Sequence, residues 1–298
     1  MFTFPAMNTE VTVTASGDEQ ACATRVAQTF AEAEQRFSRF REDSELSALN
    51  RAQGPFVASP PLFELLARAR RYVELTDGLF DPAIGATLAA LGYDRSFAPR
   101  ALDRACAAPL PAGARFLDVV LDEPTRTVLR PRQVHLDLGG IAKGATVDRA
   151  AVHLVSSGAI DAGGDAVLRG AAPDGGEWLV EIEDPRDPSR TLATVAASNA
   201  AVATSAPNRR RWRLGASVAH HLIDPRTGRP STSDLLQATV VAPSAELADV
   251  LAKTAYLLGA RDGRRFLERR PGIGGVLVRA SGEPLLVGVL DVREVAHA

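Results

Sequence analysis

The chain has 298 residues, of which 46% are hydrophobic and 23% charged, a composition typical of a globular protein and unlike that of a disordered one. Its 34 Lys and Arg side chains nearly balance its 36 Asp and Glu side chains, and the formal net charge is -2. Nucleic-acid-binding proteins usually carry a basic excess, whereas the tight basic run here is confined to residues 209–211. The charge therefore argues against a nucleic-acid partner, and the length allows one large domain or two modest ones.

No stretch of the sequence approaches the roughly 18 consecutive apolar residues of a membrane span, so none is predicted. The first residues lack the basic segment and apolar core of a signal peptide, which predicts a cytoplasmic protein. An exported or lipid-anchored form whose leader has been removed stays open. Cys22 and Cys106 are the only cysteines, and we expect two free, structural thiols rather than a disulfide framework.

In chain order, residue alternation predicts strands, and apolar spacing of three and four residues predicts helices. The first half of the sequence gives a strand over residues 9–13, helices over 18–36 and from Pro60 to the Asp77-Gly78 pair, a polar segment over 37–50, an irregular exposed excursion over 97–115, and strands over 116–121 and 127–129.

The second half continues with a strand over 135–138 and a helix over about 143–156. It then gives strands over 166–169, 178–183, 192–197, 202–204, 238–241, 275–278 and 285–287, and a helix over 245–258 that Gly259 ends. Stretches rich in strands, interrupted by a few helices, indicate an α+β fold rather than a regular alternation of strand and helix.

A glycine-rich turn is the most informative local feature. The predicted strand over 135–138 ends at Gly139 and Gly140, and the next helix begins near Lys143. Exposed backbone N–H groups, the helix N-terminus and an ammonium together suit a phosphate. The spacing matches neither the P-loop nor the dinucleotide fingerprint, and a plain strand-to-helix connection explains the glycines equally well. A second turn, Ala-Gly-Gly-Asp at 162–165, is interpreted as a connection with a solvated Asp165.

Two further groups of residues could carry chemistry. His220 and His221 precede Asp224, which could orient a histidine acting as general base, although residues 224–228 are also a good turn sequence. Adjacent histidines point to opposite faces when extended, so at most one is expected in a site.

Asp249 and Lys253 lie four residues apart on a predicted helix that is apolar nearly all round. They form either a surface ion pair or a buried group that needs a ligand or metal, and the apolar surroundings favour the second interpretation.

These features occur in one order along nearly the whole chain, and the order is more specific than any single feature. The series comprises Met-Asn-Thr at 7–9, Ser-Arg-Phe at 38–40 before Asp-Ser-Glu-Leu-Ser-Ala-Leu-Asn at 43–50, Phe-Asp-Pro-Ala-Ile-Gly at 80–85, the glycine turns at 136–144 and 162–165, Ala-Thr-Ser at 203–205, His-Leu-Ile-Asp-Pro-Arg-Thr-Gly at 221–228, and Ala-Asp at 248–249. This series resembles that of the ApbE family, the FAD:protein FMN transferases.

The resemblance implies an α+β, T-fold-like architecture of mixed and antiparallel sheets with flanking helices. It implies a single domain over residues 1–298, or two lobes with the FAD cleft between them. It also implies an enzyme that binds FAD as substrate, uses Mg2+ at the pyrophosphate, and transfers FMN to a Thr or Ser hydroxyl of a target flavoprotein while AMP leaves. A glycine-rich turn, a cation and a metal-binding carboxylate are the parts that such a transfer needs.

Motif matching implies roles for individual residues. His221 matches the histidine that deprotonates the acceptor hydroxyl, and Asp249 matches the metal-binding aspartate; both are counted as catalytic. The backbone carbonyl of Ala142 is the second expected metal ligand. The expected FAD contacts are Met7, Gly139, Gly140, Lys143, Asp148 and Ile223, the last through its backbone.

Three positions depart from the family pattern. Lys253 stands where a metal-binding Thr is usual, and an ammonium cannot coordinate a cation. Thr254 is rotated by about 100° around a helix and is not expected to replace it. Either Lys253 takes the place of the ion at the FAD pyrophosphate, or the chain has lost Mg2+-dependent transfer and only binds FAD or hydrolyses it to FMN and AMP. Asn8 and Ala206 stand where glycines are usual.

Overall fold

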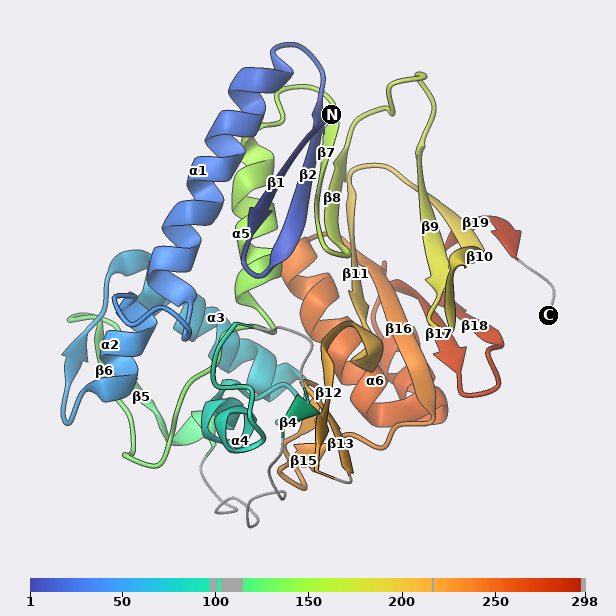
Figure 1. The fold of residues 1–298 in the computed structure, drawn as a ribbon. Helices are drawn as coiled ribbons and strands as arrows, with labels where there is room; N and C mark the ends of the chain where they lie inside the picture. Colours follow the sequence, from blue (N-terminus) through green and yellow to red (C-terminus); the bar gives the residue numbers. More distant parts are fainter. Residues whose placement is uncertain (97–100, 103–114, 216, 296–298) are drawn as a thin grey trace. The chain divides into compact units, whose positions relative to one another are not determined.

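The computed structural model describes residues 1–96, 101–102, 115–215 and 217–295 (Figure 1). It divides into two compact units: one contains Met1–Ala31, Lys143–Ala206 and Thr232–Ala298, and the other contains Glu32–Ala142 and Pro207–Ser231. A single domain over residues 1–298 stays a prediction. Most of the excursion expected over 97–115, including Cys106, lies outside the described residues.

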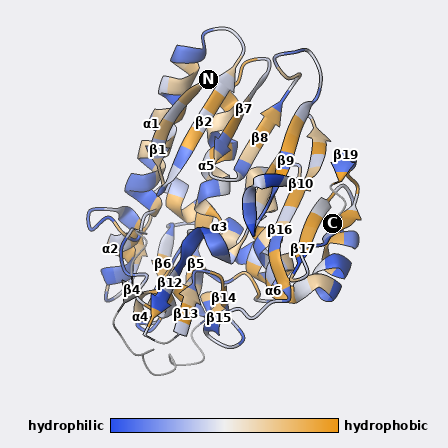
Figure 2. Cartoon of the chain, turned by 45° about the vertical axis from the view of Figure 1, so that its right-hand side comes forward, coloured by the Kyte–Doolittle hydropathy of each residue, from blue (hydrophilic) through white to orange (hydrophobic). Residues whose placement is uncertain are grey.

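The first unit is built on an eight-stranded antiparallel sheet, seen in Figure 1. In order across the sheet, its strands are β1 (Phe2–Ala6), β2 (Thr9–Ala15), β7 (Gly158–Ala162), β8 (Asp165–Arg169), β11 (Ala200–Ser205), β16 (Leu235–Ala242), β17 (Gly274–Arg279) and β18 (Pro284–Gly288). A three-stranded antiparallel sheet also belongs to this unit, in the order β19 (Asp291–Val295), β10 (Asp187–Ala197) and β9 (Trp178–Asp184). Figure 2 shows hydrophobic residues along β8 and β16, as expected of strands buried in a core.

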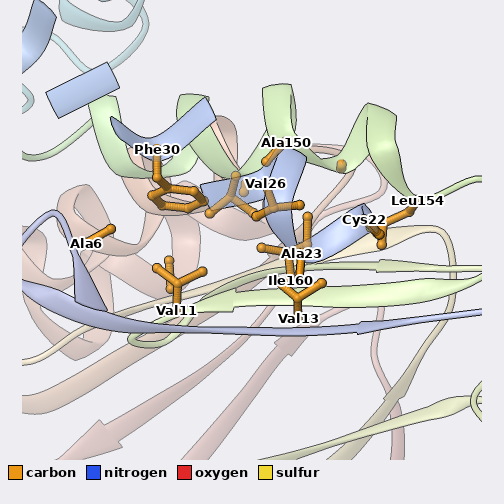
Figure 3. Packing of buried hydrophobic residues seen from close by; sticks show 14 of the residues in the cluster. Ala6, Val11, Val13, Cys22, Ala23, Val26, Phe30, Ala150, Leu154 and Ile160 are labelled. Atoms are coloured by element: carbon orange, nitrogen blue, oxygen red, sulfur yellow. The ribbon is translucent and has the colours of Figure 1, made fainter. Parts of the chain in front are cut away.

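Helix α1 (Glu19–Phe37) packs its apolar side onto one face of the larger sheet (Figure 3). The spacing of Ala23, Val26 and Phe30 places their side chains on one stripe, as the sequence predicts. They meet buried residues of β2, β7, the end of α5 and the chain after it, namely Val11, Val13, Ile160, Ala150 and Leu154. Cys22 lies in the same core as a free thiol, and burial raises its pKa.

Helix α6 (Ala245–Glu268) packs against β11, β16 and β17 of the same sheet. It is longer than predicted because the chain turns at Gly259, where φ is 82°, and then resumes the helix. The side chain of Asp234 accepts a hydrogen bond from the N–H of Ala260 at 2.8 Å and so caps the resumed part. Gly259 interrupts the helix as expected, but does not end it.

The second unit holds three small sheets and three helices among the described residues. The sheets are β3 (Phe56–Val57), β6 (Thr127–Leu129) and β5 (Val120–Asp122); β13 (Ser217–His220), β12 (Arg211–Leu214) and β4 (Ala101–Leu102); and β14 (Ile223–Asp224) with β15 (Arg229–Pro230). The helices are α2 (Glu45–Arg51), α3 (Pro60–Leu75) and α4 (Gly85–Ala90). Tyr93 and Trp212 pack at 5.6 Å between ring centroids in its aromatic core.

The predicted fold class is confirmed, because helices flank sheets whose strand pairs are antiparallel except for β4 with β12. The segment over residues 37–50, described from the sequence only as polar, contains α2, which begins where Ser44 caps the N–H of Ser47. The predicted strand over 116–121 begins instead as a 3₁₀ turn, because Asp118 accepts a hydrogen bond from the N–H of Arg115. No helix in the described part of the chain is long and apolar enough to cross a membrane.

Candidate functional site

The glycine-rich turn leads directly into α5 (Ala142–Ala150). The N–H groups of Ile141 and Ala142 donate to the carbonyl of Leu138 at 3.0 and 2.8 Å, which closes the turn. The N–H of Gly139 donates to Oδ1 of Asp137 at 2.8 Å. These three N–H groups are engaged within the turn, so what the turn offers an anionic ligand is the partial positive charge of the N-terminus of α5. The helix predicted over 143–156 is shorter, and ends in a 3₁₀ turn.

The extended segment before this turn is not a strand, so the prediction over residues 135–138 is wrong. Asn50 on α2 donates to the carbonyl of Leu136 at 2.9 Å and accepts from its N–H at 2.8 Å. The N–H of Asp137 donates to the carbonyl of Pro82 at 2.8 Å. The alternating leucines produce a strand-like pattern, but the backbone groups pair with a side chain and a loop instead of a neighbouring strand.

Lys143, in the first turn of α5, contacts the second glycine turn. Its ammonium forms an ion pair with Asp165 and donates to the carbonyl of Ala162 at 2.7 Å. Asp165 is 1% exposed. Its interpretation as a solvated turn residue is therefore wrong, because Lys143 compensates a buried carboxylate.

The second glycine turn lies against the β1–β2 hairpin. Gly163 and Gly164 have φ values of 63° and 95°, and a Cβ on Gly163 would overlap Oγ1 of Thr9. The hairpin turn itself consists of Met7 and Asn8, with φ values of 48° and 59°. Asn adopts positive φ more readily than most residues, so Asn8 serves here in the place of a glycine.

Asp148 holds the start of α6. Its two carboxylate oxygens accept hydrogen bonds from the N–H groups of Ala245 and Glu246, at 2.7 and 2.9 Å. The helices approach closely, since a Cβ on Gly144 would lie 2.5 Å from the carbonyl oxygen of Ala245. Asp148 therefore positions the helix that carries Asp249, and its expected FAD contact stays a prediction.

Asp249 and Lys253 both lie on α6. Lys253 is 7% exposed and Asp249 is half-buried, which contradicts a surface ion pair and agrees with the interpretation of a buried polar group. Thr254 is fully buried, and its hydroxyl donates to the carbonyl of Val250 at 2.7 Å. It therefore does not replace the missing Thr at position 253.

A metal site made only of side chains is absent from the described residues, since no three or more His, Cys, Asp or Glu groups gather in them. Mg2+ commonly binds with one or two carboxylates, water and substrate phosphates. The carboxylate of Asp249 and the backbone carbonyl of Ala142 are each of a ligand type that such a mixed site can use. Two such protein ligands would not suit an ion that requires all of its ligands from the protein.

His220 is held as a structural residue. The N–H of Leu222 donates to its Nδ1 at 3.3 Å, and its Nε2 lies 3.0 Å from the carbonyl of Ser231, which assigns the proton of a neutral ring to Nε2. Burial lowers the pKa of His220, the hydrogen bond to Ser231 opposes this, and the charge of Arg211 adds to the lowering. Of the two histidines, His220 is therefore the structural one, and the expected role of His221 stays a prediction.

His221 lies between β13 and β14 and is half-buried. Its N–H donates to the carbonyl of Arg210 at 3.3 Å, and its carbonyl accepts from the N–H of Ile223 at 3.1 Å. Ile223 is fully buried in the core of the second unit, so an FAD contact by this residue would have to use its backbone.

Asp224 does not orient a histidine. Its carboxylate accepts hydrogen bonds from Nε and Nη2 of Arg226, at 3.0 and 2.8 Å, and its carbonyl accepts from the N–H of Gly228 at 2.8 Å. Burial raises the pKa of Asp224, but the hydrogen bonds and charge of Arg226 outweigh this and the net pKa is below its usual value. The turn interpretation of residues 224–228 is therefore the correct one.

Each unit thus brings together part of the expected site. In the first unit, Asp148 holds the helix of Asp249 and Lys253, and Lys143 holds the glycine turn that lies against Thr9 of the β1–β2 hairpin. In the second, Gly139, Gly140 and Ala142 form the anion-suited turn, and His221 and Ile223 lie between β13 and β15.

Sequence reasoning missed Asp137 and Asn50, which hold the extended segment before α5. The Asp-Leu-Gly sequence carried a usable signal for Asp137, because an Asp side chain often accepts from the N–H two residues on.

Fold and site together define a class: an α+β protein with two glycine-rich turns and a buried carboxylate–lysine pair beside one of them, suited to a phosphate-bearing ligand. A match to the model of the ApbE family covers residues 7–277. An FAD:protein FMN transferase of Treponema pallidum is 32% identical, over 85% of this chain and 77% of that protein. One from Klebsiella pneumoniae is 28% identical, over 90% of this chain and 85% of that protein.

Solved structures agree. The ApbE protein of Thermotoga maritima matches with a TM-score of 0.83 at 25% identity, over 96% of each chain. A flavin transferase structure from Vibrio cholerae has the same fold, with a TM-score of 0.81 at 24% identity, over 96% of each chain. The chain belongs to the ApbE family.

Proposed function

We propose that this chain is an FAD:protein FMN transferase, which moves FMN from FAD to a Thr or Ser hydroxyl of a target flavoprotein and releases AMP. The family match and the names of its relatives support this function. The structural observation that carries it is the turn at Gly139 and Gly140, which opens α5 and is suited to the pyrophosphate of FAD.

In the proposed reaction, the acceptor hydroxyl oxygen attacks the phosphorus of the FMN half of FAD. The bond from this phosphorus to the bridging oxygen breaks, and AMP leaves with that oxygen. His221 takes the hydroxyl proton, and a phosphoester joins FMN to the acceptor. The protein contributes chiefly by positioning these groups and by compensating charge on the pyrophosphate.

Lys143 has a positioning role in this scheme. Its ammonium is engaged by Asp165 and by the Ala162 carbonyl, so it is not a mobile contact for phosphate. It holds the second glycine turn, which lies against Thr9 of the β1–β2 hairpin, in one conformation. Lys253 is then the lysine proposed to compensate the pyrophosphate, because Lys143 and Lys253 are the only lysines in the chain.

Mg2+ is the proposed cofactor, with Asp249 and the carbonyl of Ala142 as its protein ligands. When bound, the ion would compensate negative charge on the pyrophosphate. Asp148 supports this role, because it fixes the N-terminus of the helix that carries Asp249.

The transfer is tested by incubating the protein with FAD, Mg2+ and a fragment of a flavoprotein that carries the acceptor Thr. We expect the fragment to become fluorescent in a denaturing gel, and a Thr→Ala fragment to stay dark. A fragment that never gains covalent flavin fluorescence would defeat the proposal.

Lys253 favours a second candidate function, in which the chain binds FAD without transferring it or hydrolyses it to FMN and AMP. Pure binding predicts FAD affinity that is indifferent to EDTA and no AMP. Hydrolysis predicts AMP with free FMN and no covalent flavin. The same incubation, analysed for AMP, free FMN and labelled acceptor, separates the three outcomes.

A further inference from the structure

Arg39 is a buried cation in the second unit, in the segment between α1 and α2. Its side chain is 10% exposed, and its Nε forms an ion pair with Asp137. The guanidinium carbon lies 4.1 Å from the ring centroid of Phe40 and 4.8 Å from that of Tyr93. The guanidinium is thus fixed by a carboxylate and by two aromatic rings.

Asp137 connects this cation to the glycine-rich turn. Oδ2 pairs with Arg39, while Oδ1 accepts the hydrogen bond from the N–H of Gly139 at 2.8 Å. One residue earlier, Asn50 holds both backbone groups of Leu136. The segment over residues 38–50 therefore supplies side chains that fix the backbone entering α5.

This arrangement is a poor one for stability alone. Nη2 of Arg39 is buried, and none of the described groups accepts a hydrogen bond from it. A buried ion pair with an unsatisfied donor stabilises a fold less well than apolar residues of the same volume. What the pair does provide is a single orientation of the Asp137 carboxylate, and hence of the Gly139 amide.

We propose that Arg39 is a positioning residue for FAD: through Asp137, which accepts from the Gly139 amide, it fixes the backbone conformation of the Gly139–Gly140 turn that is proposed to receive the pyrophosphate. This inference rests on the proposed function, because it takes FAD as the ligand of the turn. It assigns Arg39 no contact with FAD. Its effect falls on FAD affinity and on KM for FAD, and kcat at saturating FAD changes little.

The test is a double-mutant cycle on the Arg39–Asp137 pair, with Arg39→Gln, Asp137→Asn and the double variant. We expect each single variant to weaken FAD binding, measured by flavin fluorescence, by roughly tenfold. The double variant should bind no worse than either single variant, because both remove the same link. Arg39→Lys should restore part of the affinity, since it keeps the charge but loses the planar fork.

The matched control is Arg186→Gln in the first unit, which breaks another ion pair to a buried carboxylate, that of Asp184, and should leave FAD affinity unchanged. Melting curves identify variants that do not fold. If Arg39→Gln does not fold, the test can still be made with Asp137→Asn, because the Asn side chain has nearly the same shape as the Asp side chain. Wild-type affinity in folded variants, or additive losses in the double variant, would overturn the proposal.

Hydrogen exchange in the absence of FAD separates this inference from the proposed function. Arg39→Gln should accelerate exchange at the Gly139 amide in the folded protein, because the Asp137 carboxylate that accepts from this amide is no longer held by Arg39. A wild-type protein that does not bind FAD would defeat the proposed function, whereas unchanged exchange at Gly139 would defeat the role of Arg39.

Discussion

Lys253 is the residue whose chemistry departs furthest from the family pattern. It is a buried ammonium on α6, four residues after Asp249, where a hydroxyl that binds metal is usual. An ammonium at a buried position attracts a doubly charged pyrophosphate more strongly than one in water, because the local dielectric is low. In the proposed function, this position therefore decides whether the positive charge beside the pyrophosphate comes from the protein or from an ion.

Replacing Lys253 with Thr should make charge compensation at the pyrophosphate depend on Mg2+ instead of on the lysine ammonium. We expect the rate of AMP release from FAD in EDTA to fall by roughly tenfold or more in this variant. Added Mg2+ should then raise the rate by a larger factor than it does in the wild-type protein. The measurement is the rate of AMP release against Mg2+ concentration. Lys253→Met, which supplies neither charge nor ligand, should be slow at every concentration. Identical Mg2+ dependence in Lys253→Thr and wild type would show that Lys253 is not at the pyrophosphate.

The two adjacent histidines should behave differently. His221→Gln removes the proposed base, and we expect the transfer rate to fall by a factor of about 100 to 10,000 with FAD affinity nearly unchanged. His220→Gln keeps a donor for Ser231, so it should retain most of the transfer rate. Single-turnover kinetics with saturating FAD measure both. If His220→Gln is the slower of the two, the assignment of the base is wrong.

At the scale of elements, Asp148 joins α5 to the start of α6. Asp148→Ala leaves two N–H groups at the N-terminus of α6 without their acceptor, and we expect a loss of about 2 kcal/mol in the free energy of unfolding. Asp18→Ala is the matched control, because Asp18 is exposed and accepts from only the N–H of Ala21, at 2.9 Å. It should cost roughly 0.5–1 kcal/mol. Urea denaturation compares the two, and an equal loss would contradict the role of Asp148.

The hairpin of β12 and β13 should be sensitive to acid through His220. Its pKa in the folded protein lies below the usual value of 6.5, chiefly because of burial. A base with a lowered folded pKa contributes stability above its unfolded pKa, and this contribution is lost as the pH falls through the folded pKa. We expect Tm to fall on acidification below about pH 6.5, and to fall less in His220→Gln. Part of the decline should persist, since burial and Arg130 also lower the pKa of His135. Parallel pH curves for the two proteins would contradict this account.

The elements that were predicted well are those whose pattern is decided locally. Strand β6 has the predicted bounds, and α1 and α3 lie within a residue or two of theirs, because apolar spacing and the two prolines at the start of α3 act within a few residues. The segment over residues 135–138 has the same kind of local pattern. Its partner is the side chain of Asn50, 86 residues away, which no periodicity reveals.

The same limit applies to the candidate site. The sequence places Lys143 beside the glycine-rich turn, but its partner Asp165 is brought to it by the pairing of β7 with β8. Arg211 belongs to the basic run over residues 209–211, whereas the structure places it with Arg213 on the exposed face of β12, opposite buried Trp212 and Leu214. The chemistry of single residues could be predicted from the sequence. The contacts that hold those residues in place, such as the one between Lys143 and Asp165, could not, because they depend on the tertiary fold.

For the molecule as a whole, the net charge of -2 conceals where the positive charge lies. Both lysines are largely buried, Lys143 with a carboxylate against it and Lys253 on the helix of Asp249, whereas Arg264 and Arg279 form exposed pairs with Glu268 and Glu283. In our account the two lysines and Asp249 serve one substrate, FAD. Whether FMN reaches a protein hydroxyl therefore separates transfer from FAD binding and from hydrolysis.

The most direct measurement is a stoichiometry. The full chain is incubated with FAD, Mg2+ and the acceptor fragment, the fragment is examined by intact-mass spectrometry, and AMP is quantified in the same sample. We predict a mass increase of one FMN less water on the fragment, one AMP for each modified fragment, and neither with the Thr→Ala fragment. AMP released with an equal amount of free FMN and an unmodified fragment, or no AMP at all, would contradict the proposed transfer.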